Sequence, residues 1–371
     1  MSKRKGSDRQ TGLKLNRRHV VVGGLAAGAM LAASRPMKVF AQTASNIRAD
    51  VPGLDPKLAE LYAKTKAAGE TQVIYYGNRK ELYDALNPTF TKRFPGIEFK
   101  MEPYDPTAGA ARVLAEISRG PSADVFEGSF LQGKALDERE VFDTSVDWKA
   151  MGIPDDRIGF KGAVQTFHFL LLHAYNPKKL GRDQLPKTNA DFLDPKWKGQ
   201  IVTNDFQLTA HLAWWVWATK DFDGAVAWVN KLKEDQQLVI TGTLPSSLAL
   251  VTQGTKPLHL FGSFSDIENN RRQGADVDTY GTQHMGGVAA QVAVLKKARS
   301  PNAGALLSLW MQTDEAQGLM WDKFYASWGR GERFLGEHIK KNNIDVAWET
   351  RENYLERAGI NGRLRKALGL A

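Results

Sequence analysis

The sequence predicts an α/β protein in which helices cover both faces of a mostly parallel sheet. Three observations lead to this fold class. Short apolar strands alternate with amphipathic helices from about residue 70 onward, which is the pattern of βαβ units. The chain has 371 residues, too many for one domain of ~100–200 residues. Residues 164–175 (VQTFHFLLLHAY) form one long apolar run, which we expect to be a single strand passing between two lobes.

The first lobe is expected to begin near residue 70, after an N-terminal helix. Asp55 is the expected N-cap of that helix and Pro56 its first residue, where the missing amide hydrogen has no cost. Gly69 closes the helix. The strands expected next are 71–76, 97–101 and 124–126. Helices are expected at 79–86, in a separate stretch capped by Asn87-Pro88, and at 107–118.

The second lobe is expected to repeat this alternation after the long strand. Its predicted strands are 200–203 and 238–241, and its predicted helices are 207–219, 222–233 and 246–253. Strand 258–262 is the expected return crossing to the first lobe. An apolar strand at 287–295 and a helix at 301–311 follow.

The first 41 residues have the order of a secretory signal: a basic stretch, an apolar run and a small-residue site ending at Ala41. The apolar run, 20–33, has 14 residues and is shorter than the ~20 that span a bilayer. An uncleaved membrane anchor is the alternative. Residues 16–21 (NRRHVV) resemble the twin-arginine export motif, although His19 and Val20 depart from it. This resemblance implies export of a folded chain by the twin-arginine translocase, with the periplasm as destination.

The net charge of +9 is concentrated in this segment. Residues 1–41 carry nine Lys and Arg against Asp8, which is 9 − 1 = +8, so the other 330 residues carry 9 − 8 = +1. The charge of the remaining chain therefore gives no reason to expect nucleic acid as a partner. A polyanion-binding protein is a further alternative, and it predicts strong, salt-dependent retention of the mature form on DNA or heparin.

Motifs for catalysis and cofactor binding are missing from the sequence. There is no cysteine, which excludes disulfides, Fe–S clusters, thiolate zinc sites and a cysteine nucleophile. There is no G-x-S-x-G elbow, H-E-x-x-H motif, P-loop, G-x-G-x-x-G loop or EF-hand. The histidines lack metal-ligand spacing, and His168 and His173 on the long strand are expected to be structural. We expect no cofactor, no metal and no enzymatic activity.

Polar residues recur where the predicted strands end. Ligands of open α/β sheets bind at the carboxyl ends of the strands, where hydroxyl groups and helix N-terminal amides are available. Each group also has a simpler interpretation as a cap or turn: Ser246 is typical of an N-cap, and Gly77-Asn78 of a turn. The candidate solute-binding residues are Tyr76, Asn78, Arg79, Glu127, Ser129, Thr203, Asp205, Thr209, Thr243, Ser246, Ser247, Ser263 and Asp266.

Several segments together resemble the periplasmic solute-binding proteins of bacterial ABC importers, in the cluster of ferric-iron, thiamine, polyamine and aminoethylphosphonate binders. They occur in the family's order over about 70–320, and FLDPKWKG is the most specific. The segments are VIYYGN (73–78), FTKRFPGIEF (90–99), ARVLAEISRGPSADVFEGS (111–129), DFLDPKWKGQIV (191–202), LVTQGTKPLHLF (250–261) and PNAGALLSLWMQTDEAQG (301–318).

This resemblance implies a two-lobed (Venus flytrap) fold, in which each lobe is a mixed, mostly parallel sheet flanked by helices. It implies a monomer that traps one small solute between the lobes and delivers it to a membrane permease. The expected parts are a signal peptide (1–41), a lead-in with the N-terminal helix (42–69), a first lobe (70–167 plus 263–325), a second lobe (168–262) and a C-terminal helical segment (326–371) that packs on the lobes.

The candidate residues limit the solute without identifying it. Iron binders of this cluster carry adjacent tyrosines after the return strand, where this chain has Phe264, so ferric iron is disfavoured. Arg79 suits a carboxylate, phosphate or phosphonate. The carboxylates Glu127, Asp205 and Asp266, together with Tyr76 and a tryptophan, suit an amine such as a polyamine or thiamine. The sequence favours an anionic or zwitterionic organic solute. A periplasmic enzyme that uses a cofactor or metal, exported by the twin-arginine route, is the rival hypothesis.

Overall fold

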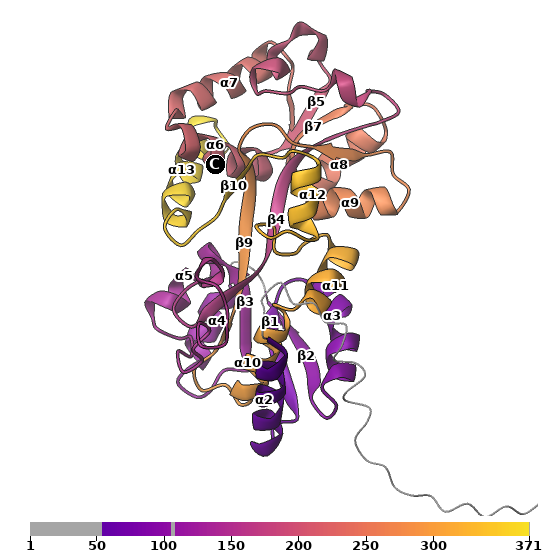
Figure 1. Ribbon diagram of the computed structural model, residues 1–371. Helices are drawn as coiled ribbons and strands as arrows, with labels where there is room; N and C mark the ends of the chain where they lie inside the picture. Colours follow the sequence, from indigo (N-terminus) through magenta and orange to yellow (C-terminus); the bar gives the residue numbers. More distant parts are fainter. Residues whose placement is uncertain (1–53, 105–107, 371) are drawn as a thin grey trace, which may run out of the picture. The chain divides into compact units, whose positions relative to one another are not determined.

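The computed structural model describes residues 54–104 and 108–370, so the predicted signal peptide and residues 42–53 lie outside it. The strands in the described ranges form one mixed sheet in the order β2-β1-β3-β9-β4-β7-β5-β6 (Figure 1). Two further strands join this sheet at its middle, where β10 lies beside β9 and β8 beside β4. The predicted α/β class is confirmed. No helix in the described ranges is long and apolar enough to cross a membrane.

The first lobe is built on three parallel strands. The central strand β1 (Gln72–Gly77) pairs with β2 (Glu98–Pro103) and with β3 (Val125–Ser129). Helix α2 (Leu54–Ala67) precedes β1, and Gly69 after it has a φ of +69°, the left-handed conformation expected of a closing glycine. The other helices of this part are α3 (Lys80–Arg93), α4 (Gly109–Glu116) and α5 (Phe130–Glu138).

The two helices expected on either side of Asn87-Pro88 are one continuous helix, α3, with Pro88 in its interior. An interior proline removes one backbone hydrogen bond and is usually unfavourable. Here the buried side chains Leu82, Leu86 and Phe90 lie before and after the proline along the same helix. Packing of this apolar face outweighs the lost hydrogen bond, so the predicted break is wrong.

Two long antiparallel strands connect the lobes. Strand β4 (Ala163–Tyr175) pairs with β9 (Met285–Val294) over its first part, and its second part pairs with β7 (Leu258–Ser263) and β8 (Asp278–Tyr280). Strand β9 pairs with β10 (Val346–Trp348) at its start and with β3 at its end. The return crossing is therefore β9, and the prediction that 258–262 returns the chain is wrong. The limits of the lobes stay a prediction. We propose that the second lobe ends where β9 returns the chain to the first lobe, and not at residue 262.

The second lobe contains the parallel strands β5 (Ile201–Asn204), β6 (Val239–Thr241) and β7. Its helices are α6 (Asp205–Thr219), α7 (Phe222–Glu234), α8 (Leu244–Thr252) and α9 (Phe264–Arg272). Short 3-10 helices are η2 (Asp155–Arg157) before β4, and η3 (Arg182–Gln184), η4 (Ala190–Leu193) and η5 (Pro195–Trp197) before β5. These bounds agree closely with the predicted strands and helices of this part of the chain.

The remaining helices pack on elements that have already been described. Helix α10 (Pro301–Trp310) packs on α2 and on β9, and α11 (Asp314–Phe324) packs on α3 (Figure 1). They are followed by α12 (Leu335–Lys341) and α13 (Tyr354–Ala367), and α13 contacts α5, α6 and α7.

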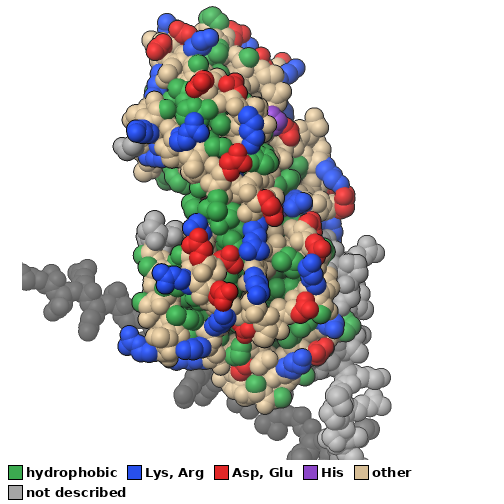
Figure 2. Space-filling model, turned by 90° about the vertical axis from the view of Figure 1, so that its left-hand side faces the viewer, with side chains coloured by type: hydrophobic (Ala, Val, Ile, Leu, Met, Phe, Trp, Pro, Cys, Tyr) green, Lys and Arg blue, Asp and Glu red, His purple; other side chains and the backbone are tan. Residues whose placement is uncertain are grey.

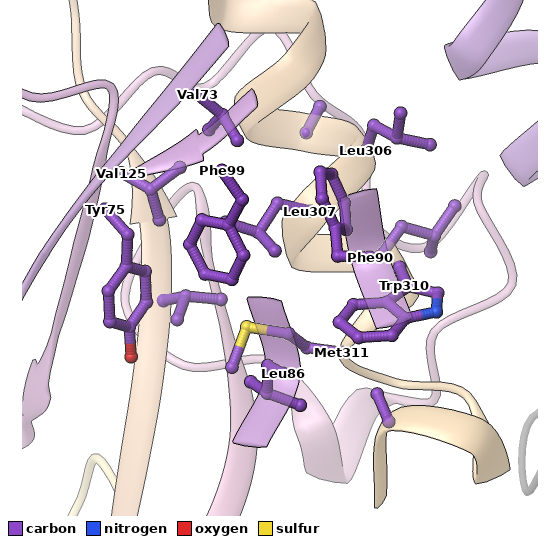
Figure 3. Close-up of a cluster of buried hydrophobic side chains, with 14 of the residues drawn as sticks. Val73, Tyr75, Leu86, Phe90, Phe99, Val125, Leu306, Leu307, Trp310 and Met311 are labelled. Carbon is purple, nitrogen blue, oxygen red and sulfur yellow. The ribbon is translucent and has the colours of Figure 1, made fainter. Parts of the chain in front are cut away.

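Separate hydrophobic cores lie in the two lobes. In the first lobe, one cluster joins β1, β2 and α3 to α10, and Figure 3 shows Phe90, Phe99, Leu307 and Trp310 gathered in it. The centroids of the Phe90 and Trp310 rings are 5.3 Å apart, and the ring planes meet at 66°. A second cluster contains Tyr76, Phe126 and other side chains of the first lobe. Two further clusters stabilise the second lobe. Burial of this apolar surface is the main force that holds each lobe together.

Candidate functional site

The carboxyl ends of the parallel strands in both lobes meet the crossing strands near their middle. In the first lobe, Ser129 at the end of β3 pairs with Ala290 of β9, which pairs with Phe167 of β4. In the second lobe, Ser263 at the end of β7 pairs with Leu171 of β4. These two positions on β4 are 171 − 167 = 4 residues apart, or about 13 Å at the usual strand rise. The strand ends of the two lobes are therefore separated by the length of a small solute.

The first-lobe part of the candidate site centres on Arg79, directly before α3. Its Nη1 donates to Glu127 Oε1 at 2.6 Å and to Asn78 Oδ1 at 2.9 Å. The Arg79 guanidinium also lies 4.3 Å from the centre of the Phe169 ring on the crossing strand β4. Its side chain is 20% exposed, whereas that of Glu127 is fully buried. Arg79 is therefore held from two sides but keeps some access to solvent.

Glu127 lies beside buried phenol groups. Its Oε2 is buried, and the hydroxyl of the neighbouring buried Tyr75 interacts with this carboxylate. Burial, with Glu127 as the next cause, raises the pKa of Tyr75 well above its usual value. The same two causes raise the pKa of Tyr104, whose hydroxyl donates to the backbone oxygen of Glu127 at 2.6 Å. Both phenols stay protonated and neutral, so they do not add negative charge beside Glu127.

In the second lobe, several candidate residues lie at the starts of two helices, α6 and α8. Asn204 caps α6 by accepting from the amide of Gln207 at 2.9 Å. Asp205, the first residue of α6, lies 3.5 Å from the guanidinium of Arg365 on α13. Thr243 caps α8 and accepts from the amide of Ser246. The expectation that Ser246 caps this helix is wrong, because the helix begins two residues earlier, at Leu244.

The start of α9 carries the last two candidate residues. Ser263 Oγ lies 3.1 Å from Ser265 Oγ, and Ser263 makes no side-chain cap bond to the helix. Asp266 is exposed. Ser129, in the first lobe, is committed to a capping box with Gln132 at the start of α5. Ser129 therefore already caps its own helix, whereas Ser263 does not.

Besides Glu127, four candidate residues have buried side chains that contact the protein itself. The Tyr76 ring is 1% exposed and packs on Tyr104, with ring centroids 4.9 Å apart. Thr203 donates to the backbone oxygen of Leu260 at 2.7 Å, and Thr209 to that of Asp205 at 3.2 Å. Ser247 Oγ lies 2.7 Å from His259 Nε2. These contacts stabilise each lobe, and a role in solute binding stays a prediction for all candidates.

Sequence reasoning missed the side chains that hold Arg79 and Asp205 in place. Phe169 lies on the crossing strand β4, where successive side chains point to opposite faces of the sheet. The sequence does not show which of these faces lies toward Arg79. Arg365 lies 365 − 205 = 160 residues from its partner, and no local pattern connects the two. Two exposed apolar side chains were also missed: Leu131 on the first turn of α5 and Phe206 on the first turn of α6, 57% and 62% exposed.

Metal ligands do not gather in the described part of the chain, where no group of three or more His, Cys, Asp or Glu is arranged to hold an ion. Phe264 is buried against Trp321 and Tyr325.

Two cavities of about 210 and 500 Å³ occur elsewhere, one beside Lys161 and Arg351 and the other along residues 183–196. Neither contains a candidate residue. Figure 2 shows hydrophobic side chains gathered in a hollow at mid-height, with charged side chains above and below.

Comparison with known proteins agrees with this geometry. The sequence family described as bacterial extracellular solute-binding protein matches residues 135–310. A comparison with curated proteins gives no match. The family match supports the resemblance to bacterial extracellular solute-binding proteins, and the solved structures described next support the fold.

Solved structures with the same fold cover most of this chain. Iron-bound HitA from Pseudomonas aeruginosa has a TM-score of 0.59 and 18% identity, over 81% of this chain and 98% of its own. The substrate-binding protein of an ABC transporter from Agrobacterium tumefaciens has a TM-score of 0.64 and 16% identity, over 81% and 94%. AfuA from Actinobacillus pleuropneumoniae, with fructose-6-phosphate bound, has a TM-score of 0.56 and 17% identity, over 81% and 99%. The predicted two-lobed fold is confirmed.

Proposed function

We propose that this chain, which has the two-lobed fold of ABC-transporter solute-binding proteins, traps one small organic solute between its lobes for a membrane permease. The observation that carries the proposal is the convergence of strand ends from both lobes on Phe167–Leu171 of β4, with Arg79 and Glu127 at the first-lobe edge. Closure of the lobes would bury a solute there and give affinity through hydrogen-bond donors already in place.

The proposed solute is anionic or zwitterionic. Arg79 is the cation among the candidate residues, and its fixed guanidinium suits a carboxylate, phosphate or phosphonate. The Glu127 carboxylate lies beside Arg79, and its negative charge favours a solute that also carries a positive group such as an ammonium. A polyamine, thiamine and ferric iron remain the alternative ligands. Iron is the least favoured, because Phe264 supplies no oxygen and the described residues contain no cluster of metal ligands.

We further propose a periplasmic monomer without enzymatic activity, exported by the twin-arginine translocase. The family match to extracellular solute-binding proteins supports an extracytoplasmic location. The NRRHVV segment supports the route. The ABC-transporter relatives support a permease as the partner that receives the solute.

A thermal-shift screen of the full-length chain tests the proposal. The panel contains amino acids, aminoethylphosphonate, organic acids, sugar phosphates, polyamines, thiamine and ferric citrate. We expect one anionic or zwitterionic solute to raise the Tm, since a ligand at 100 times its Kd stabilises the folded state by about 2.7 kcal/mol. Arg79→Ala is expected to lose the shift relative to its own baseline, while Lys231→Ala, at an exposed position on α7, keeps it.

The outcomes separate the hypotheses. A shift with a polyamine or thiamine would overturn the proposed charge class but keep the transport role. A tightly bound, stoichiometric metal or cofactor in the purified protein would favour the rival hypothesis of an exported enzyme. No shift with any solute in the panel would count against a solute-binding role.

A further inference from the structure

We propose that the C-terminal strap, defined as residues 346–370, ties the two lobes together and limits how far they move apart. The strap contains β10 and α13. Helix α13 contributes to the hydrophobic cores of both lobes. Tyr354, its first residue, lies in a first-lobe cluster, whereas Ile360 and Leu364 lie in a second-lobe cluster. A single rigid helix therefore spans the two bodies that β4 and β9 connect.

The first-lobe anchor of the strap is aromatic. The Tyr354 ring stacks on Phe130 of α5, with centroids 5.5 Å apart and planes at 26°, and it meets the edge of Phe160 at 5.7 Å. Tyr354 is only 6% exposed. Close by, the Arg351 guanidinium lies 3.5 Å from the carboxylate of Asp137 at the end of α5. The strap therefore contributes a buried side chain to the first-lobe core.

The second-lobe anchor covers most of α13. The apolar face of α13 packs on this lobe, and polar contacts add to it. Glu356 accepts from Lys220 Nζ at 2.8 Å and from the indole of Trp217 at 3.1 Å, both at the end of α6. At the other end of the strap, Lys233 Nζ on α7 donates to the backbone oxygen of Leu368 at 2.9 Å. Because these contacts run along the helix, α13 moves with the second lobe as one body.

Between the two anchors, a buried ion pair fastens the strap to the crossing strand. The Glu349 carboxylate accepts from the amide of Ala289 on β9 at 3.1 Å and pairs with Arg357. The Arg357 guanidinium lies 3.6 Å above the ring of Trp214 on α6. Glu349 and Arg357 have side chains only 4% and 11% exposed. A charge left unpaired there would be costly, so the strap stays fixed at the crossing.

Rotation of the lobes about β4 and β9 moves α5 relative to α6. Since α13 follows α6, such a rotation has to pull Tyr354 away from Phe130 and Phe160. The aromatic anchor therefore favours the lobe arrangement seen in this structure and restricts others. This inference concerns the protein without solute and does not rest on the proposed function.

The absence of cysteine allows a direct test in the full-length chain. Spin labels are attached through Lys92→Cys on α3 and Asp223→Cys on α7, both exposed and on different lobes, and the distance distribution is measured by pulsed electron resonance. We expect Tyr354→Ala to broaden the distribution roughly twofold, because the lobes then sample more arrangements. Tyr354→Phe keeps the aromatic stack and is expected to leave the width unchanged.

A matched control lies on the same helix. Arg363 is exposed, and its guanidinium lies 4.3 Å from the centre of the Phe222 ring in the second lobe, so Arg363→Ala is expected to leave the distribution unchanged. If circular dichroism shows that Tyr354→Ala is unfolded, Arg351→Ala removes the polar first-lobe contact at a half-exposed position, and a smaller broadening is expected. Unchanged widths in the folded first-lobe variants, or equal broadening by Arg363→Ala, would overturn the proposal.

Discussion

The Arg79 guanidinium lies 2.6 Å from the Glu127 carboxylate and 4.3 Å from the centre of the Phe169 ring. These contacts join the end of β1, the end of β3 and the crossing strand β4. The pair places one positive and one negative charge at the first-lobe edge of the candidate site. A fully buried carboxylate depends on its partner, because the unpaired charge would lose its solvation without compensation.

Removal of Arg79 is therefore expected to destabilise the protein even without solute. Arg79→Ala leaves the buried Glu127 charge unpaired and should lower the free energy of unfolding by about 3 kcal/mol. Urea denaturation at pH 7 measures this change. Glu127→Gln in the Arg79→Ala background should recover part of the loss, since the unpaired charge is gone. Lys80→Ala, which breaks the exposed Lys80–Asp84 pair, serves as the control and should have no measurable effect.

Buried histidines should make the second lobe sensitive to acid. Burial lowers the pKa of His173 and of His259 to about 3. Because the folded pKa lies below the unfolded value of about 6.5, the unfolded state binds more protons between these values. Stability is thus complete above about pH 6.5 and declines as the pH falls toward 3, by up to ~1.4 kcal/mol per pH unit for each histidine.

Urea denaturation at pH 7 and pH 5 tests this dependence. His259→Gln removes one titrating group and keeps a polar side chain near Ser247, so the difference in stability between the two pH values should shrink. Lys231→Ala, at an exposed position on α7, changes no histidine and should leave that difference unchanged. An unchanged difference in His259→Gln would contradict the assignment.

The core that Figure 3 shows predicts a large effect of truncating Phe90. Phe90 is fully buried and its ring contacts those of Phe94, Phe99 and Trp310. Phe90→Ala should cost about 3–5 kcal/mol, because it removes apolar contacts and leaves a cavity. Phe206→Ala is the comparison: at 62% exposure, its effect should stay within about 0.5 kcal/mol. Equal losses in chemical denaturation would mean that Phe206 is covered in solution.

The start of α8 gives a smaller and sharper prediction. Thr243→Ala removes the side-chain acceptor of the Ser246 amide and should lower stability by about 1 kcal/mol. Ser246→Ala keeps that acceptor and should cost less. A larger loss of stability in Ser246→Ala than in Thr243→Ala would mean that Ser246 is the cap.

Strand and helix positions could be predicted because they depend on local patterns. Strand partners could not: 258–262 and 287–295 are both apolar, and only pairing across the sheet makes β9 the return strand. The strand-end candidates were found by the same local logic, but alternation alone did not place Tyr76 in the core. Partners such as Glu127 for Arg79, 127 − 79 = 48 residues away, depend on the folded arrangement.

The place of α13 in both cores has a consequence for synthesis. Ile360, Leu364 and Leu368 complete the second-lobe core, and Tyr354 completes a first-lobe cluster. These residues are synthesised after the other residues of both cores, so neither lobe has its full apolar interior until α13 has emerged. Domains usually fold from the N-terminus as they emerge. Here both cores are completed only after α13 has been synthesised.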